Sequence, residues 1–278
     1  MSSEQQLTVR FWGVRGTLPT AGPDTVRYGG NTSCVEAELG NRSVIFDAGT
    51  GIRKLGESLA GRGGSVETDI LFSHCHMDHV CGVPFFAPFY SPGNRIRLWA
   101  GNLLPNGSLE AAIRSIMSPP VFPIEIEAFK AEVQFRDFHA GELLDLGGGI
   151  KARTGLLNHP DGAVGYRLEW AGKSIAYVTD TEHRPNELDR TVLSLVQNAD
   201  LMIYDCTYTD EEFPDHLGWG HSTWQQAVRL AKAGSVNRLA IFHHDPDHDD
   251  AFMQKVEIAA SKVHPGAFVA HEGLVLQL

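Results

Sequence analysis

One segment constrains this chain more than any other feature, because it places four metal-capable side chains within six residues. The segment is His74-Cys-His76-Met-Asp78-His79, and the apolar residues directly before it are typical of a buried strand. Alternate residues of an extended segment point the same way, so His74 and His76 can bind one cation. Asp78 and His79, at the start of the following helix, can face a second cation. Imidazole nitrogens together with a carboxylate suit zinc, manganese or iron better than magnesium or calcium.

Three later segments are each typical of a β-strand that leads to a metal-capable residue. They are residues 150–157 before His159, 173–178 before Asp180 and 238–242 before His243. Each of these residues indicates little alone, because an isolated histidine at a strand end is more often an ordinary polar residue. The ordered set, following the histidine-rich segment, is what indicates a metal site.

The spacing of the histidine-rich segment resembles the HxHxDH signature of the metallo-β-lactamase superfamily. This resemblance implies two divalent transition metals, with zinc expected first and manganese or iron as alternatives. It also implies a full ligand set, in which Asp180 bridges the two metals. The implied ligands are His74, His76 and His159 for the first metal, and Asp78, His79 and His243 for the second.

A second set of motifs resembles ribonuclease Z and its phosphodiesterase relatives. The motifs are Phe11 to Pro19, Gly29 to Ser33, Asp200 to Tyr208 and Gly220-His221-Ser222-Thr223. The last two resemble the His-Glu-Ala-Thr and Gly-His-Ser-Thr motifs of that group, with Asp205 where glutamate is common. The resemblance implies that His221 is a general acid held by Asp205, and that Asp78 orients the nucleophile or takes its proton. The alternative for His221 is a residue that only precedes a helix capped by Ser222 or Thr223.

Strands and helices alternate along the second half of the chain, and short strands separated by glycine-rich and proline-rich turns open the first half. This order predicts an α/β fold, an αββα sandwich of metallo-β-lactamase type with two mixed sheets flanked by helices. We expect residues 1–278 to form a single hydrolase domain. A less regular, proline-rich stretch at about 85–138 is interpreted as an insert that covers the metal site and contributes to substrate choice.

The charge of the chain argues against a long polyanionic substrate. The formal net charge is −11, and the sequence has no run of Lys and Arg. Neutralisation of phosphates by cations supplies most of the sequence-independent affinity for nucleic acids. The basic Gly/Pro-rich arm with which ribonuclease Z holds tRNA is also missing. We therefore expect a small phosphodiester as the partner and disfavour large nucleic acids.

The sequence thus predicts a metal-dependent hydrolase, specifically a phosphodiesterase that cleaves small or cyclic nucleotide phosphodiesters with metal-activated water. Two alternatives within the fold are a lactonase or thioesterase and a ribonuclease Z-like RNA endonuclease. A third alternative is a non-catalytic sensor module, although an intact ligand set argues against it. His221 favours the phosphodiesterase, because an alkoxide leaving group needs a proton whereas attack on a lactone or thioester does not require this acid.

Further expectations concern the residues around the site and the location of the protein in the cell. Asn31 and the backbone of 13–16 are expected to line the pocket, and one polar residue of 244–248 is expected to support His243 through its second nitrogen. Glu182 and His183 are candidates to support the metal ligands from behind.

No apolar run approaches the ~20 residues that cross a bilayer, and the N-terminal residues lack signal-peptide features. We expect a cytoplasmic protein without membrane contact; its assembly, a homodimer included, stays open.

Overall fold

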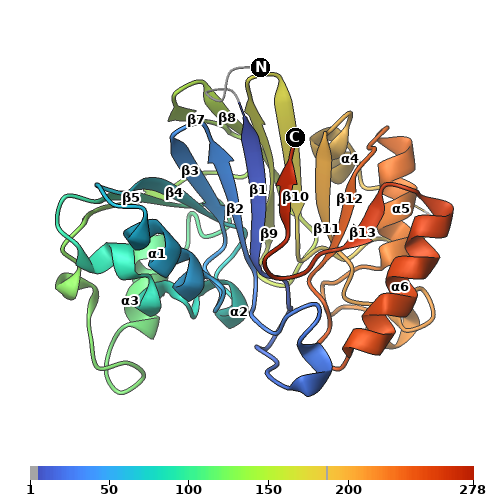
Figure 1. Ribbon diagram of the computed structural model, residues 1–278, viewed down its shortest axis with the longest axis horizontal. Coiled ribbons are helices and arrows are strands. Elements are labelled where there is room, and N and C mark those ends of the chain that lie inside the picture. Colours follow the sequence, from blue (N-terminus) through green and yellow to red (C-terminus); the bar gives the residue numbers. More distant parts are fainter. Residues whose placement is uncertain (1–5, 186) are drawn as a thin grey trace.

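The computed structural model describes residues 6–185 and 187–278, and these fold into two facing β-sheets with helices on both outer sides (Figure 1). Each sheet has seven strands. In Figure 1, α1 and α3 lie on one side of the pair of sheets, and α4, α5 and α6 lie on the other. The predicted αββα sandwich is therefore the observed fold.

The first sheet contains most of the N-terminal half and one strand from the C-terminus. Its order is β14-β1-β2-β3-β4-β5-β6. The strands are β14 (Val275–Gln277), β1 (Leu7–Gly13), β2 (Cys34–Leu39), β3 (Arg42–Phe46), β4 (Glu67–Phe72), β5 (Arg95–Ala100) and β6 (Glu132–Asp137). The helices that belong to this half are α1 (Ile52–Gly61), the short α2 (Met77–Val80) and α3 (Leu109–Ile116).

The second sheet follows the chain order without interruption, β13-β12-β11-β10-β9-β8-β7. Its strands are β7 (Leu143–Gly147), β8 (Ile150–Leu157), β9 (Ala163–Trp170), β10 (Lys173–Val178), β11 (Leu201–Asp205), β12 (Leu239–Phe242) and β13 (Ala267–Val269). Its helices are α4 (Arg190–Val196), α5 (Trp224–Ala233) and α6 (Asp250–Val263).

Both sheets share one pairing pattern. From β14 to β6, and again from β7 to β13, three antiparallel pairs are followed by three parallel pairs. Parallel neighbours end at the same edge of a sheet, so residues that follow them gather there. This edge of each sheet supplies side chains to the site described below.

The apolar core has three parts, because both faces of each sheet are buried. The part between the sheets includes Phe11, Phe46, Tyr166 and Phe242. A second part lies between the second sheet and α4, α5 and α6, and a third lies between the first sheet and α1 and α3. These contacts fix the positions of the strand ends.

The stretch 85–138 is a correction to the sequence analysis, because much of it is framework rather than an insert. β5 and β6 pair in parallel with the first sheet, and α3 packs on its outside with Leu109 and Ile113 buried. The prolines of this stretch lie between these elements rather than inside them, and their density hid the strand pattern. A role of its loops in substrate choice stays a prediction.

None of the helices in the described residues is both long and apolar enough to cross a membrane.

Candidate metal centre

The candidate site forms where strands from both sheets end, and three of its residues have an unusual backbone. Asp47 follows β3, Asp180 lies just beyond β10 and His243 follows β12, with φ values of 59°, 55° and 62°. This left-handed region costs about 1–3 kcal/mol for a non-glycine residue and persists where the surrounding structure enforces it. The strained residues gather at the site, which is a common property of functional positions.

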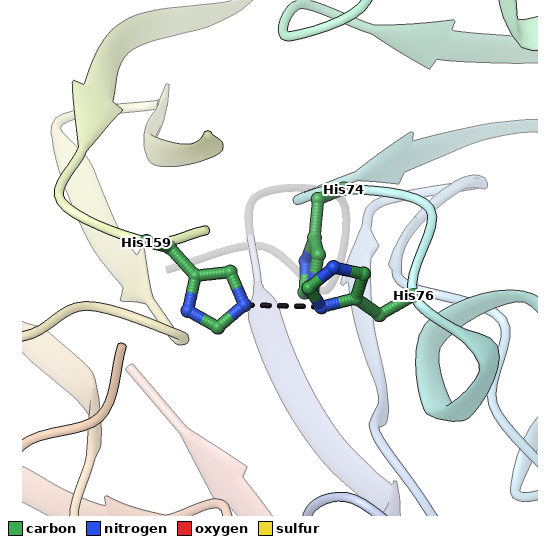
Figure 2. A group of neighbouring side chains, drawn as sticks. All are labelled: His74, His76 and His159. Carbon is green, nitrogen blue, oxygen red and sulfur yellow. Dashed lines mark hydrogen bonds between the residues drawn. The ribbon is translucent and has the colours of Figure 1, made fainter. Parts of the chain in front are cut away.

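The first group of candidate ligands consists of His74, His76 and His159. Figure 2 shows the three imidazoles facing one another, with His159 Nε2 3.1 Å from His76 Nδ1. One nitrogen of each lies within 4.8 Å of the others. His74 is buried whereas His76 is partly exposed, with 41% of its side chain accessible. This group therefore opens toward solvent on the side of His76.

The second group consists of Asp78, His79, Asp180 and His243, and all four are buried. Their ligand atoms lie within 4.8 Å of one another. His79 Nε2 is 3.1 Å from Asp78 Oδ2, and His243 Nε2 is 3.3 Å from the same oxygen. Asp78 is also held by the backbone amide of Thr17, which donates to Oδ2 at 2.8 Å.

Asp180 connects the two groups through its two different oxygens. Its Oδ1 lies 3.8 Å from His74 Nε2 and 3.7 Å from His159 Nε2. Its Oδ2 lies 3.3 Å from His79 Nε2 and 3.2 Å from His243 Nε2. One carboxylate that faces two sets of imidazoles in this way has the geometry of a bridging ligand between two metals.

The residues present fit metal ions, because the four imidazoles that face Asp180 direct Nε2 toward its carboxylate. The Nε2 atoms of His74 and His79 are buried and have no hydrogen-bond partner. Their Nδ1 atoms have acceptors behind them: Asp47 lies 2.9 Å from His79, and Ser73 Oγ, 3.0 Å from His74, itself donates to Asp47. A proton on Nδ1 leaves the Nε2 lone pair toward the centre, as metal-ligating histidines require.

His159 and His243 repeat this arrangement. His159 Nδ1 is 2.8 Å from the carbonyl oxygen of Gly220. His243 Nδ1 is 3.0 Å from Thr207 Oγ1, which in turn donates to Asp205 at 2.8 Å. A polar residue of 244–248 was expected to support His243, and this prediction was wrong. Thr207 does so because β11 lies beside β12, which brings the residues after the two strands together.

Asp47 is a site residue that the sequence analysis missed. It is fully buried and accepts from the Ser73 amide and hydroxyl, the Tyr177 hydroxyl and His79, at 2.7–2.9 Å. Tyr177 comes from the opposite sheet, so the carboxylate also joins the two halves. Its only sequence signal is its place as a polar residue at the end of the short apolar run 43–47.

The electrostatics of the centre favour neutral imidazoles in the first group and positive charge in the second. Burial lowers the pKa of His74 and of His159, so both are neutral, as a ligand must be. Burial also opposes charge on His79, but Asp78, Asp180 and Asp47 outweigh it and raise the pKa of His79 well above its usual value. Three buried carboxylates around one imidazole place excess negative charge in the interior, which a bound cation would offset.

His221 and Asp205 form a hydrogen-bonded pair beside Asp180. His221 Nδ1 is 3.0 Å from Asp205 Oδ2 and 3.8 Å from Asp180 Oδ1. Asp205 is fully buried and also accepts from the amides of Thr181 and Thr207. Burial opposes the charged imidazole, yet Asp205, together with Asp180 and Asp78, outweighs burial and raises the pKa of His221 to about 9. Thr223, rather than His221, caps α5 by accepting from the Gln226 amide.

The glycine segment near the site has a simple steric role. A Cβ on Gly16 would lie only 2.3 Å from His243 Nδ1, so this position needs glycine for the imidazole to fit. Asn31, in contrast, was expected to line the pocket and does not point there. Its side-chain amide donates to Glu272 at 2.8 Å, in the loop before β14. Its carbonyl accepts from Val14 and Arg15.

The remaining histidines near the site have partners of their own. His183 Nδ1 lies 2.8 Å from Ser222 Oγ, next to His221. His244 Nε2 lies 2.8 Å from the Ala270 carbonyl, and His248 Nε2 lies 2.9 Å from Glu212. Among the described residues, none of these three belongs to a group with metal-binding geometry. Glu182 accepts from the amides of Gly218 and Gly220, close to His221.

Comparison with known families decides the classification of this chain. The family model of the β-lactamase superfamily domain matches residues 42–244, which is more than two thirds of the chain. The chain belongs to the metallo-β-lactamase superfamily. This confirms the resemblance drawn from the histidine-rich segment, and the buried His/Asp cluster fits the metal binding that defines the superfamily.

Individual relatives of this metallo-β-lactamase superfamily member are named ribonuclease Z. A ribonuclease Z of Gemmatimonas aurantiaca is 26% identical over 322 positions, covering 98% of this chain and 96% of the relative. A ribonuclease Z of Natronomonas pharaonis is 25% identical, with 85% and 86% covered.

Solved structures show the same fold across nearly the whole chain. The metallo-β-lactamase fold protein YhfI from Bacillus subtilis aligns with a TM-score of 0.74 at 18% identity, covering 99% of this chain and 100% of its own. A diphosphatase of the PhnP family gives 0.71 at 19% identity, with 99% and 98% covered. The short form of human tRNase Z gives 0.69 at 20% identity, with 97% and 98% covered.

Proposed function

We propose that this protein is a dinuclear metal-dependent phosphodiesterase that cleaves small or cyclic nucleotide phosphodiesters. The observation that carries the proposal is the position of Asp180, whose two oxygens face two separate groups of imidazoles, with His221 beside it. The names of the relatives, ribonuclease Z and a diphosphatase, support chemistry at phosphorus.

The metal ligands in this proposal are His74, His76 and His159 for one ion and Asp78, His79 and His243 for the other, with Asp180 shared. When bound, two divalent cations, zinc first among them, lower the pKa of water and neutralise developing charge on phosphate oxygens. Asp78 orients the attacking water or takes its proton. The Thr17 amide fixes one oxygen of Asp78 for this role.

His221 supplies the proton that the departing sugar oxygen needs. Asp205 holds its Nδ1, so Nε2 is the nitrogen left to donate. The same carboxylate favours the protonated ring, because it raises the pKa of His221 against the effect of burial. An acid in place beside Asp180 distinguishes this site from one designed for lactones or thioesters, whose leaving groups need less help.

The charge of the surrounding loops supports a small substrate. Residues 76–90, 158–162, 208–221 and 243–250 contain ten Asp or Glu and no Lys or Arg, and the neighbouring loops 13–20 and 181–189 add only Arg15, which is buried, and Arg184. Two metals and a few amides can hold one phosphodiester, whereas a long polyanion needs many cations along its path. The alignment to the Gemmatimonas ribonuclease Z spans 322 positions against 278 residues here, so that relative carries segments that this chain lacks.

RNA endonuclease activity of the ribonuclease Z type is the second candidate, favoured by the names of the full-length relatives. The two candidates differ in substrate size. We expect cleavage of cyclic mononucleotides, cyclic dinucleotides or short diesters, and little or no cleavage of precursor tRNA at physiological salt. Accurate trimming of tRNA 3′ ends by the metal-loaded protein would replace the proposal with the endonuclease.

Replacement of His221 tests the proposal most directly. In His221→Ala, turnover of a sugar phosphodiester should fall by roughly 10²–10⁴, the usual effect of losing a general acid, while metal content is unchanged. Bis(p-nitrophenyl) phosphate, whose leaving group barely needs a proton, should be affected much less. Asp205→Asn should show a milder form of the same pattern.

Controls separate acid catalysis from general damage to the site. Equal losses on both diesters would show that His221 is not the proton donor. Assays of a lactone and a thioester with the same preparations test the other hydrolase activities. Faster turnover of either than of any diester would contradict the phosphodiesterase.

A further inference from the structure

Trp219 is the most exposed tryptophan in the described residues and lies two positions before the proposed acid His221. Its exposed fraction is 61%. A tryptophan has more apolar surface than any other side chain, and burying it is worth several kcal/mol, so its exposure beside a reactive site suggests a ligand contact.

The loop that carries Trp219 is held in place on both sides of this residue. Glu182 Oε2 accepts from the Gly218 amide at 2.7 Å and from the Gly220 amide at 3.0 Å. The Gly220 carbonyl contacts His159 Nδ1 at 2.8 Å. Gly218 and Gly220 have φ values of 87° and 85°, which glycine adopts without strain. The indole is therefore attached to a fixed backbone rather than to a free loop.

Aromatic neighbours brace the indole from the protein side. The Trp219 ring contacts the His216 ring at 5.0 Å between centroids and 86° between planes. His216 in turn stacks on the buried Tyr208 at 4.1 Å and 19°. Tyr208 contacts His221 edge-on at 6.1 Å. A perpendicular contact covers at most one side of an indole, so at least one face of Trp219 is not covered by His216.

The backbone of Trp219 lies close to that of the proposed acid His221. Consecutive Cα atoms are about 3.8 Å apart, so the Cα atoms of Trp219 and His221 are at most about 7.6 Å apart. A nucleoside whose ester oxygen receives the proton from His221 can span this distance. The base of such a nucleoside would then lie on the side of the leaving group.

We infer that Trp219, braced by His216, is a stacking surface for the nucleobase of the leaving-group nucleoside. The inference rests on the proposed function and extends it, because it assigns the side of the phosphodiester on which a base is recognised. Stacking accepts any base, since each has a π-face. The site therefore recognises an aromatic heterocycle by its face and selects against leaving groups that are bare sugars.

Equilibrium binding to the metal-loaded protein tests this inference without relying on turnover. Adenosine 5′-monophosphate and ribose 5-phosphate share the phosphate and sugar and differ in the base. By calorimetry, wild-type protein should bind the nucleotide roughly 5- to 150-fold more tightly, the range of one base–aromatic stack. Trp219→Ala should lose this preference while binding ribose 5-phosphate as before. Trp219→Phe should keep most of it.

Leu217 provides the matched control, since it is an exposed apolar residue of the same loop, without a ring. Leu217→Ala should keep the wild-type preference. An equal affinity of wild type for both ligands, or a preference unchanged in Trp219→Ala, would overturn the inference.

Kinetics with two diesters, one with a nucleoside and one with a base-free ribose as leaving group, separate this inference from the proposed function. A wild type that cleaves both diesters with equal kcat/KM overturns the stacking surface alone. A base preference in binding that Trp219→Ala removes, without cleavage of either diester, upholds the stacking surface and overturns the proposed function.

Discussion

The two groups of candidate ligands differ in how deeply the fold encloses them. The second group, Asp78, His79, Asp180 and His243, is buried throughout, and its imidazoles are fixed by hydrogen bonds that His79 donates to Asp47 and His243 donates to Thr207. The first group includes His76, which is partly exposed and whose nearest carboxylate, that of Asp161, is 92% exposed. A preorganised, dry cluster and an open one therefore lie side by side and share one carboxylate.

This difference in burial suggests different roles for the two groups of ligands. Electrostatic interactions are strongest where water is excluded, so the second group is suited to hold its ion permanently. The open first group is suited to admit substrate. Each of the following substitutions tests one side of this comparison.

Asp180→Ala should have the largest effect, because this carboxylate belongs to both groups. Wild-type protein should carry close to two transition-metal equivalents per chain, and the variant should lose both. A bridging carboxylate offsets the repulsion between two dications, so its loss costs more than the loss of one terminal imidazole. Elemental analysis after gel filtration measures the content. A variant that retains either metal fully would contradict the shared position of Asp180.

Substitution of Asp47 should mainly affect stability. Asp47→Ala leaves several buried donors unpaired and should lower the free energy of unfolding by about 3–5 kcal/mol, measured in urea. It should also weaken metal binding at His79. Asp161→Asn is the matched control, since it changes an exposed carboxylate beside the first group and should stay within about 0.5 kcal/mol of wild type. Similar losses of stability in the two variants would contradict the proposed difference between the buried and the open group.

His76→Ala should affect the first group alone. We expect loss of affinity for one of two metal equivalents, by more than the roughly 10–100-fold typical of an outer-shell partner. Unfolding of the metal-free protein should barely change, because His76 is partly exposed. Competition with a chromogenic chelator measures both affinities. Loss of the second equivalent at the same time would show that the groups are not independent.

His244 should affect the pH dependence of stability. Burial, with Arg15 nearby, lowers the pKa of His244 to about 3. The unfolded chain, with a histidine pKa of about 6.5, therefore binds the proton first. Stability from the neutral His244 is complete above pH 6.5 and is lost as the pH falls toward 3, by up to about 1.4 kcal/mol per unit.

A comparison of unfolding curves between pH 7 and pH 4 measures this slope. His244→Asn should be less stable than wild type at pH 7, and the gap should narrow as the pH falls. The exposed His139 supplies the control, since His139→Asn should leave the slope unchanged. Parallel curves for wild type and His244→Asn would show that His244 does not contribute.

The fold class followed from local patterns, and the candidate ligand set followed from the resemblance to the metallo-β-lactamase superfamily that the histidine-rich segment carries. The spacing of His74 to His79 depends on the geometry of one strand end and one turn, which a short segment encodes by itself. Alternating strands and helices predicted two sheets under helices, because apolar periodicity is also local. Strand ends before His159, Asp180 and His243 could be recognised in the same way.

Other features depended on contacts between distant segments, and no local pattern encodes such contacts. The proline-rich stretch 85–138 contains β5 and β6, and only pairing with β4 reveals them as sheet strands. Asp47 became a site residue because β3 pairs with β4, and the segment after β4 brings His79 Nδ1 to 2.9 Å from the Asp47 carboxylate, while the facing sheet adds the Tyr177 hydroxyl at 2.7 Å. Thr207 rather than a neighbour of His243 supports this histidine, because parallel pairing of β11 and β12 joins their ends. The sequence determined which side chains can bind metal. The tertiary structure decided which residues orient those side chains. Each ligating imidazole needs a hydrogen-bond partner at its second nitrogen, and for most of them the packing of the sheets brings that partner from a distant segment.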